Sequence, residues 1–254
     1  MENEYVDKEF AKEFINLLEF AKKVKEHCYS KGLDCTLTYF GWIQWCVDNL
    51  CKLEVYNDME ALKNRFNDMR LDNPVFTQWL HEWMVLCFES LAEGECFDYL
   101  GSIYEFHFKS KDKAKDTGQF FTPMHACDLM AKLTNDNTCR GYYDFIDNCC
   151  GSGRMSIKAW QNLDHKAHPY AWFANGDLDP VSVNMCALNM LFFGMIGSCS
   201  RQNAITDEWW GGYIVNATKV PVMNHGVSLH YYENREEFEA ECSRLQSLMK
   251  DYYK

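Results

Sequence analysis

The chain has 254 residues, enough for one large domain or two modest ones, each with a buried core. Hydrophobic residues make up 47% of it and aromatic residues 15%, a composition that excludes a disordered chain. The formal net charge of −12 disfavours a protein that holds nucleic acid through a broad basic face of its own.

Three features predict a soluble, cytoplasmic protein. Residues 1–8 are polar and acidic, which argues against a signal peptide, and the most apolar stretch, 190–196, is far shorter than the ~20 residues that span a bilayer. The 13 cysteines are odd in number and lack Cys-x-x-Cys spacing, which indicates reduced thiols. His81 and Glu82 begin a zinc-protease pattern, but Val85 stands where the second histidine belongs, so we expect no metal.

The first part of the chain, residues 1–108, is predicted to be an all-helical N-terminal domain. Its first helix has an apolar stripe at helical spacing, formed by Phe10, Phe14, Leu17, Ala21 and Val24. Further helices are expected over 36–56, 59–69 and 73–108, the last interrupted near Gly94.

The second part, residues 109–254, begins with a lysine-rich run that we interpret as a linker. Short β-prone segments then alternate with helical ones. Strands are expected at 142–147, 170–174, 196–200, 213–215 and 227–232, and helices at 154–162, 179–193 and 235–253. This alternation predicts an α/β fold with a parallel, Rossmann-like sheet.

A glycine turn between a predicted strand and helix indicates a nucleoside-binding site. Gly151 and Gly153 would let the backbone approach a ligand closely and direct amides toward it. Asp177, at the end of the next strand, could accept the ribose hydroxyls. A purely structural turn is the alternative. A dinucleotide site is disfavoured because Ser156 replaces the third glycine of that motif.

Four ordered segments make this interpretation more specific. They are Asp-Tyr-Leu-Gly-Ser-Ile-Tyr-Glu at 98–105, Thr-Gly-Gln-Phe-Phe-Thr-Pro at 117–123, Asp-Asn-Cys-Cys-Gly-Ser-Gly at 147–153 and Gly-Asp-Leu-Asp-Pro at 176–180. Together they resemble the adenine-specific DNA methyltransferases, above all the modification subunits of type I restriction-modification systems. The resemblance covers roughly residues 95–205. It implies a Rossmann-like domain that binds S-adenosylmethionine (SAM), preceded by a helical domain.

The resemblance also implies which residues contact SAM. They are Phe120, Phe121, Thr122 and Pro123 at the methionine end, Asp147, Cys149, Gly151 and Gly153 around the amino acid moiety, Asp177 at the ribose, and Leu178 and Asn203 at the adenine.

The acceptor side of the pattern is incomplete. The family holds the target adenine with an Asn/Asp-Pro-Pro-Tyr/Phe motif, whose aromatic ring stacks on a base flipped out of the duplex. Here Asn216 follows the corresponding predicted strand and is the candidate catalytic residue, but both prolines and the aromatic residue are missing. Trp209, Trp210 and Tyr213 are expected mainly to pack around that strand, with a substitute stacking platform as the alternative.

A full sheet of this class needs about three more strands with their helices after Asn216, whereas only 38 residues follow it and one candidate strand, 227–232, lies among them, so we expect a truncated sheet. The resulting hypothesis is a SAM-dependent adenine methyltransferase that needs a partner specificity protein to recognise DNA, and that could be oligomeric. A lapsed SAM-binding relative that acts as a scaffold is the main alternative, and a methyltransferase with another acceptor is the third.

Overall fold

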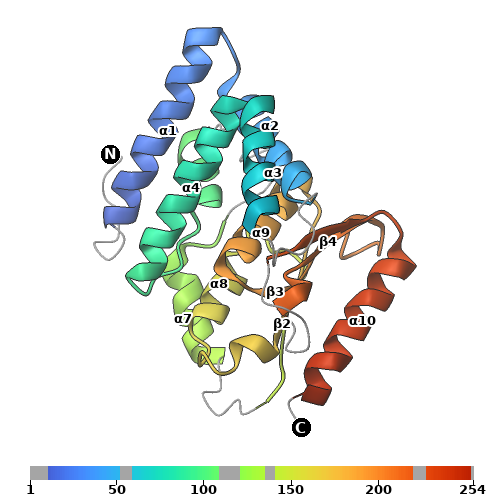
Figure 1. Cartoon of the computed structure of the whole chain (residues 1–254). Coiled ribbons are helices and arrows are strands. Elements are labelled where there is room, and N and C mark those ends of the chain that lie inside the picture. The colour runs from blue at the N-terminus through green and yellow to red at the C-terminus, as the bar shows by residue number, and fades with distance from the viewer. Residues whose placement is uncertain (1–10, 52–58, 109–120, 135–140, 220–226, 253–254) are drawn as a thin grey trace.

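The computed structural model describes residues 11–51, 59–108, 121–134, 141–219 and 227–252 (Figure 1). The first part of the described chain is helical. Its elements are α1 (Ala11–Lys31), α2 (Cys35–Leu50), α3 (Met59–Asp72), α4 (Pro74–Ala92), α5 (Tyr99–Ile103), a π-helical turn η2 (Tyr104–Phe108) and α7 (Met124–Thr134). The sequence pattern had not predicted α7.

Local capping explains where two of these helices begin. The Asn73 side chain accepts the amide of Phe76 at 3.0 Å, and Pro74 occupies the first helical position of α4. In the same way, Asp34 accepts the amide of Leu37 at the start of α2. The predicted start of α4 is therefore confirmed, with a physical cause.

A five-stranded sheet follows in the order β1-β2-β3-β4-β5. Its strands are β1 (Tyr143–Asp147), β2 (Ala171–Asp177), β3 (Ile196–Gln202), β4 (Trp209–Val215) and β5 (Leu229–Tyr232). The first three strands are parallel, whereas β4 pairs antiparallel with β3 and β5 antiparallel with β4. The expectation of a parallel sheet is therefore wrong for β4 and β5. The connection between β3 and β4 is too short for the crossover that a parallel strand needs, so β4 returns as a hairpin.

Helices cover both faces of this sheet (Figure 1). On one face lie α8 (Arg154–Gln161) and α9 (Pro180–Phe193), and α2 and α4 pack on α9. On the other face α10 (Arg235–Tyr252) buries Phe238, Leu245 and Met249 against Trp172 and Ile214. Because α9 lies between the sheet and a second layer of helices, it is apolar and buried almost all round.

The helical region and the sheet share one hydrophobic core. Trp83 of α4 meets Phe192 of α9 with ring centroids 4.5 Å apart, and the buried cluster extends from Leu17 to Leu229. The predicted domain boundary between residues 108 and 109 falls at the start of 109–120, outside the described residues. The division into two domains therefore stays a prediction.

Within the described ranges, no helix is both long enough and apolar enough to span a membrane. The cysteines in these ranges are free thiols. No group of three metal-ligating side chains comes together among the same residues.

Candidate cofactor site

The candidate site lies at the edge of the sheet where the parallel strands end. Asp147 is the last residue of β1 and Asp177 the last residue of β2. Because β1 and β2 are parallel and pair in register, with Asp147 opposite Asn175, both carboxylates lie at the same edge. The glycine turn 148–153 leaves β1 at this edge and leads into α8.

Hydrogen bonds fasten the glycine turn to the end of β2. The amide of Cys150 donates to the carbonyl of Gly176 at 2.9 Å, and the amide of Gly151 donates to Oδ2 of Asp177 at 2.8 Å. The amide of Cys149 donates to Oδ1 of Asp147 at 3.1 Å. These amides are thus used inside the protein, and the turn offers a ligand its carboxylates rather than these donors.

Asp147 and Asp177 are half-buried acids at this edge. Burial raises the pKa of Asp177, although the amides of Asp179 and Gly151 partly oppose this by donating to its oxygens. Burial also raises the pKa of Asp147. Within the described residues neither carboxylate forms an ion pair with lysine or arginine. SAM carries an ammonium group, a sulfonium and two ribose hydroxyls, and this pair of acids fits those charges and donors.

Phe121 covers the glycine turn. A Cβ added at Gly151 would lie 2.8 Å from the ring of Phe121, and Gly151 has φ +55°, so both the close approach and the backbone conformation favour glycine. Thr122 and Pro123 follow as exposed residues at the start of α7. The structure thus brings Phe121 next to the turn, whereas Phe120 lies outside the described residues. The contact with SAM expected for both stays a prediction.

The remaining candidates at the turn differ in exposure. Cys149 is exposed, and Gly153 is buried beside Cys186. Leu178, directly after Asp177, leaves 58% of its surface exposed at the sheet edge. An apolar side chain exposed beside the Asp177 carboxylate is available to cover a planar ring of a ligand.

Asn203 occupies the turn between β3 and β4. Its side-chain carbonyl accepts the amides of Ile205 at 3.0 Å and Thr206 at 3.3 Å. This oxygen therefore shapes the hairpin turn, and its predicted contact with the cofactor's adenine stays a prediction.

Asn216 lies at the opposite edge of the sheet. Because β4 is antiparallel, Val215 pairs with Gly197 at the beginning of β3, whereas Asp177 pairs with Arg201 near its end. The Asn216 side chain is fully buried and donates to the carbonyls of Met190, Leu191 and Met195 at 2.9–3.2 Å. These contacts cap the end of α9. This placement separates Asn216 from the glycine turn, and the catalytic role expected for Asn216 stays a prediction.

A buried charged network behind the turn was not foreseen from the sequence. Asp98 is fully buried, and its carboxylate accepts hydrogen bonds from Arg154 Nε at 2.8 Å and from Ser152 Oγ at 2.5 Å. Its other oxygen accepts bonds from the Gly101 amide and from Asn189 Nδ2, both at 2.9 Å. Four donors, one of them the Arg154 guanidinium, thus surround this buried carboxylate.

Arg154 connects this network to the cover of the turn. Its guanidinium donates to Glu105 at 2.9 Å and to the carbonyl of Thr122 at 3.2 Å, and lies 5.1 Å from the ring centroid of Phe121. Burial opposes its charge, but the carboxylates of Asp98 and Glu105 more than offset this and raise the pKa of Arg154. The Arg154 side chain therefore joins α8 to η2 and to the segment before α7, which lie far apart in the sequence.

Only a weak sequence signal pointed to this network. Asp98 and Glu105 lie in one of the segments that carry the family resemblance, but spacing alone does not pair them with Arg154, more than forty positions away. Their pairing depends on α5 and η2 packing against the beginning of α8.

Comparisons with known proteins show the family of this chain. The model of the N-6 DNA Methylase family matches residues 95–239, more than half of the chain, so the chain belongs to this family. It is also similar to the type I restriction enzyme MpnII methylase subunit of Mycoplasma pneumoniae, with 23% identity over 150 residues. That alignment covers 55% of this chain and 26% of the relative, so the chain spans about a quarter of the length of the protein it matches.

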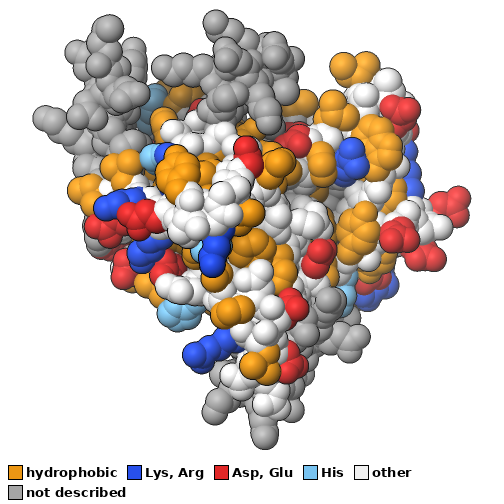
Figure 2. Space-filling model, turned by 90° about the horizontal axis from the view of Figure 1, so that it is seen from above, with side chains coloured by type: hydrophobic (Ala, Val, Ile, Leu, Met, Phe, Trp, Pro, Cys, Tyr) orange, Lys and Arg blue, Asp and Glu red, His pale blue; other side chains and the backbone are white. Residues whose placement is uncertain are grey.

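The charge on the surface bears on how such a protein would hold DNA. On the face seen in Figure 2, the described lysine and arginine side chains are scattered among acidic and hydrophobic ones. This face therefore presents no continuous basic surface in the described part of the chain, in keeping with the net charge of −12.

Proposed function

We propose that the chain binds SAM and forms the donor half of an adenine-specific DNA methyltransferase with a Rossmann-like domain. One observation carries the proposal. The turn 148–153 is tied to Asp177 by the Gly151 amide and covered by Phe121, and beside it lie two half-buried carboxylates that form no ion pair among the described residues.

In this proposal the residues of the turn bind and orient the cofactor. Asp177 accepts the ribose hydroxyls, Asp147 faces the ammonium group, and Leu178 covers the adenine. Phe121, with Thr122 and Pro123, excludes water from the methionine end. When bound, SAM supplies an electrophilic methyl group on a positively charged sulfur.

DNA is the proposed acceptor, recognised with the help of a partner protein. Two observations support the need for a partner. The net charge of −12 and the scattered cations of Figure 2 give weak attraction to phosphates. In addition, the Mycoplasma pneumoniae relative is named as a subunit of an enzyme.

Calorimetry with SAM, followed by transfer of a labelled methyl group to duplex and single-stranded DNA, tests the proposal. We expect saturable binding of SAM and of S-adenosylhomocysteine. A chain that is folded by circular dichroism yet binds neither compound at millimolar concentration would contradict it.

A second candidate is a SAM-binding relative that no longer transfers the methyl group. It is favoured by the position of Asn216 at the far edge of the sheet and by the lack of any Pro-Pro pair in the chain. SAM binding without transfer to any DNA, even when a cell extract supplies partners, would favour this candidate over the first.

A further inference from the structure

The cover of the glycine turn, residues 121–123, is held by one nitrogen of the Arg154 guanidinium. This nitrogen, Nη1, donates to Oε2 of Glu105 at 2.9 Å and to the carbonyl of Thr122 at 3.2 Å. Because the guanidinium is planar, the acceptor of one Nη1 hydrogen fixes the direction of the other. The Glu105 carboxylate therefore directs Nη1 at the carbonyl of Thr122, the residue after Phe121.

The opposite edge of the guanidinium is anchored separately in the core. Nε of Arg154 donates to Asp98 at 2.8 Å, and Nη2 donates to Oγ of Ser102 at 3.0 Å. Asp98 and Ser102 are both buried, whereas the side chain of Glu105 leaves 26% of its surface exposed. A charge pair that water partly reaches costs less to break than one fully buried in the core. Glu105 can therefore be changed while the anchor of Arg154 in the core stays in place.

The π-helical turn η2 contacts the cover at a second point. The ring of Tyr104, next to Glu105, meets the ring of Phe121 edge to face with centroids 6.0 Å apart. The Arg154 guanidinium lies 5.1 Å from the centroid of the same Phe121 ring. Gly151 approaches that ring from the turn, so closely that a Cβ there would lie 2.8 Å from it. The Phe121 ring is thus held between η2, the start of α8 and the glycine turn, and π-helical turns are frequent at functional sites.

The nucleoside end of the proposed site is held by other contacts. The Asp177 carboxylate accepts the amide of Gly151 at 2.8 Å and the amide of Asp179 at 2.9 Å, neither of which involves η2. Leu178 follows Asp177 directly at the sheet edge. Displacement of the cover should therefore affect the methionine end of a bound cofactor and spare its nucleoside end.

We propose that Glu105 is a positioning residue for the cofactor, because its carboxylate orients Arg154 and Arg154 holds Phe121 over the methionine end of SAM. The inference rests on the proposed function, since it concerns the affinity of that same site. Glu105 acts through Arg154 and does not itself contact SAM. It thereby determines how strongly the site distinguishes SAM from a ligand that has only the nucleoside.

Calorimetry with SAM and with adenosine, on the whole chain, tests the proposal. Adenosine carries the nucleoside and lacks the methionine end. We expect Glu105→Ala to weaken SAM about tenfold and to leave the affinity for adenosine unchanged. Glu105→Gln should recover most of the loss, because its side-chain carbonyl still accepts one Nη1 hydrogen. Thermal unfolding verifies that each variant is folded.

Glu95→Ala is the matched control, because it breaks a similar ion pair on the same helix. Glu95 accepts a bond from Nζ of the buried Lys158 at 3.0 Å, and Lys158 lies one helical turn after Arg154 on α8. Its loss should lower stability without changing the ratio of SAM affinity to adenosine affinity. An equal fall of this ratio in Glu95→Ala and Glu105→Ala would overturn the proposal.

Hydrogen exchange of the chain without ligand separates this proposal from the proposed function. The amides of Ala126 and Cys127 donate to the carbonyl of Pro123 directly after the cover. We expect Glu105→Ala to speed exchange at residues 121–127, and Glu95→Ala to leave it unchanged. Faster exchange in a chain that binds neither SAM nor adenosine would reject the proposed function and retain Glu105 as the residue that holds the cover. Unchanged exchange, or an equal loss of SAM and adenosine affinity, overturns the positioning role.

Discussion

The two sides of this sheet edge are built in different ways. The glycine turn is supported from behind by Asp98 and Arg154, which are fully or almost fully buried and ion-paired. The β4–β5 hairpin instead presents half-exposed aromatic residues, Trp210 and Tyr231, and a single layer of neutral amides. One side is held by buried charges, and the other by packing at the surface.

This difference predicts which side of the sheet edge tolerates substitution without loss of stability. A buried ion pair is costly to break, because removal of one partner leaves an uncompensated charge in the core. An exposed aromatic ring can be replaced with little loss of stability. We therefore expect substitutions behind the turn to lower the free energy of unfolding far more than substitutions of the exposed aromatic residues on the hairpin.

We expect the largest effect from the removal of Arg154, the cation of the buried network. Arg154→Met keeps the volume but leaves Asp98 buried without its cation, and we expect a loss of about 3–5 kcal/mol in the free energy of unfolding measured in urea. Arg235→Met is the control, since Arg235 forms its ion pairs on the surface and should change stability little. Equal stability of the two variants would refute the role assigned to the buried network.

Removal of the Asp177 carboxylate should have the next largest effect, this time on binding. Asp177→Ala deletes a charged acceptor for the ribose, so we expect SAM affinity to fall about 10- to 100-fold in calorimetry. Asp144→Ala is the control, because Asp144 is an exposed acid on β1. A similar loss in both variants would mean that general charge, and not the ribose contact, controls affinity.

Asn216 separates a structural role from a catalytic one. Asn216→Ala removes three hydrogen bonds to carbonyls at the end of α9, and we expect about 1–3 kcal/mol of destabilisation with unchanged SAM affinity. Asn216→Gly should be less destabilising, because Asn216 has φ +54°, which alanine disfavours. Full stability of Asn216→Ala, together with loss of methyl transfer, would restore the catalytic role.

The smallest expected effect is on the pH dependence of SAM binding. Ribose hydroxyls donate to the ionised form of Asp177, and burial raises the pKa of this group above the usual 3.8. As the pH falls, Asp177 therefore takes up its proton earlier than an exposed aspartate, and SAM affinity should begin to fall at a pH above 3.8. Calorimetry over a pH series measures this, and Asp177→Asn should flatten the acidic limb.

Much of the donor side could be predicted from the sequence. The residues of the turn 148–153 are neighbours in the chain, and the strand before them fixes the edge at which they lie. Parallel pairing then brings Asp177 to the same edge, as expected from the strand–turn–helix pattern. Family membership, shown by the match over residues 95–239, agrees with the ordered segments that the sequence displays.

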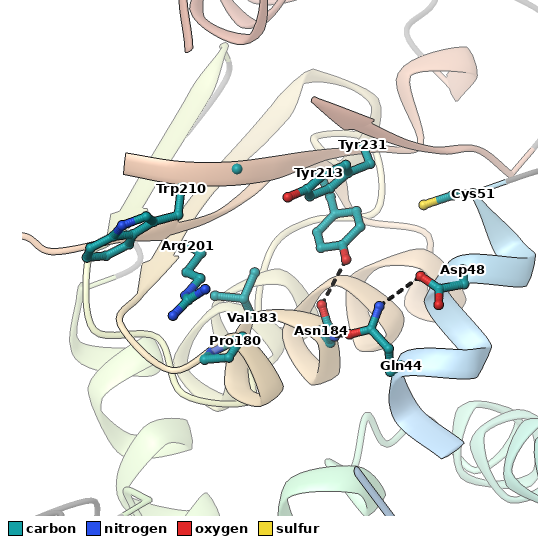
Figure 3. Close-up of a pocket in the computed structure, with 11 residues that line it drawn as sticks. Gln44, Asp48, Cys51, Pro180, Val183, Asn184, Arg201, Trp210, Tyr213 and Tyr231 are labelled. Atoms are coloured by element: carbon teal, nitrogen blue, oxygen red, sulfur yellow. Dashed lines mark hydrogen bonds between the residues drawn. The ribbon is translucent and has the colours of Figure 1, made fainter. Parts of the chain in front are cut away.

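The acceptor side was beyond prediction from the pattern. A β-prone run such as that before Asn216 has the same appearance whether it pairs parallel or antiparallel, because both pairings use the same alternation of side chains. The hairpin turn at 203–208 decided the direction of β4 and thereby placed Asn216 at the far edge. The same turn placed Trp210 and Tyr213 in the lining of a cavity between the sheet, α2 and α9 (Figure 3).

Local features of this protein follow from its sequence: most of its helices, the start of α4, the glycine turn, the acid at the end of β2 and the family. Tertiary structure alone decided which distant side chains meet, namely Arg154 with Asp98, and Asn184 with Gln44. The physical reason is the distance along the chain that separates the interacting residues. Capping and turn formation depend on neighbours within a few residues, whereas buried ion pairs and cavities depend on how whole elements pack.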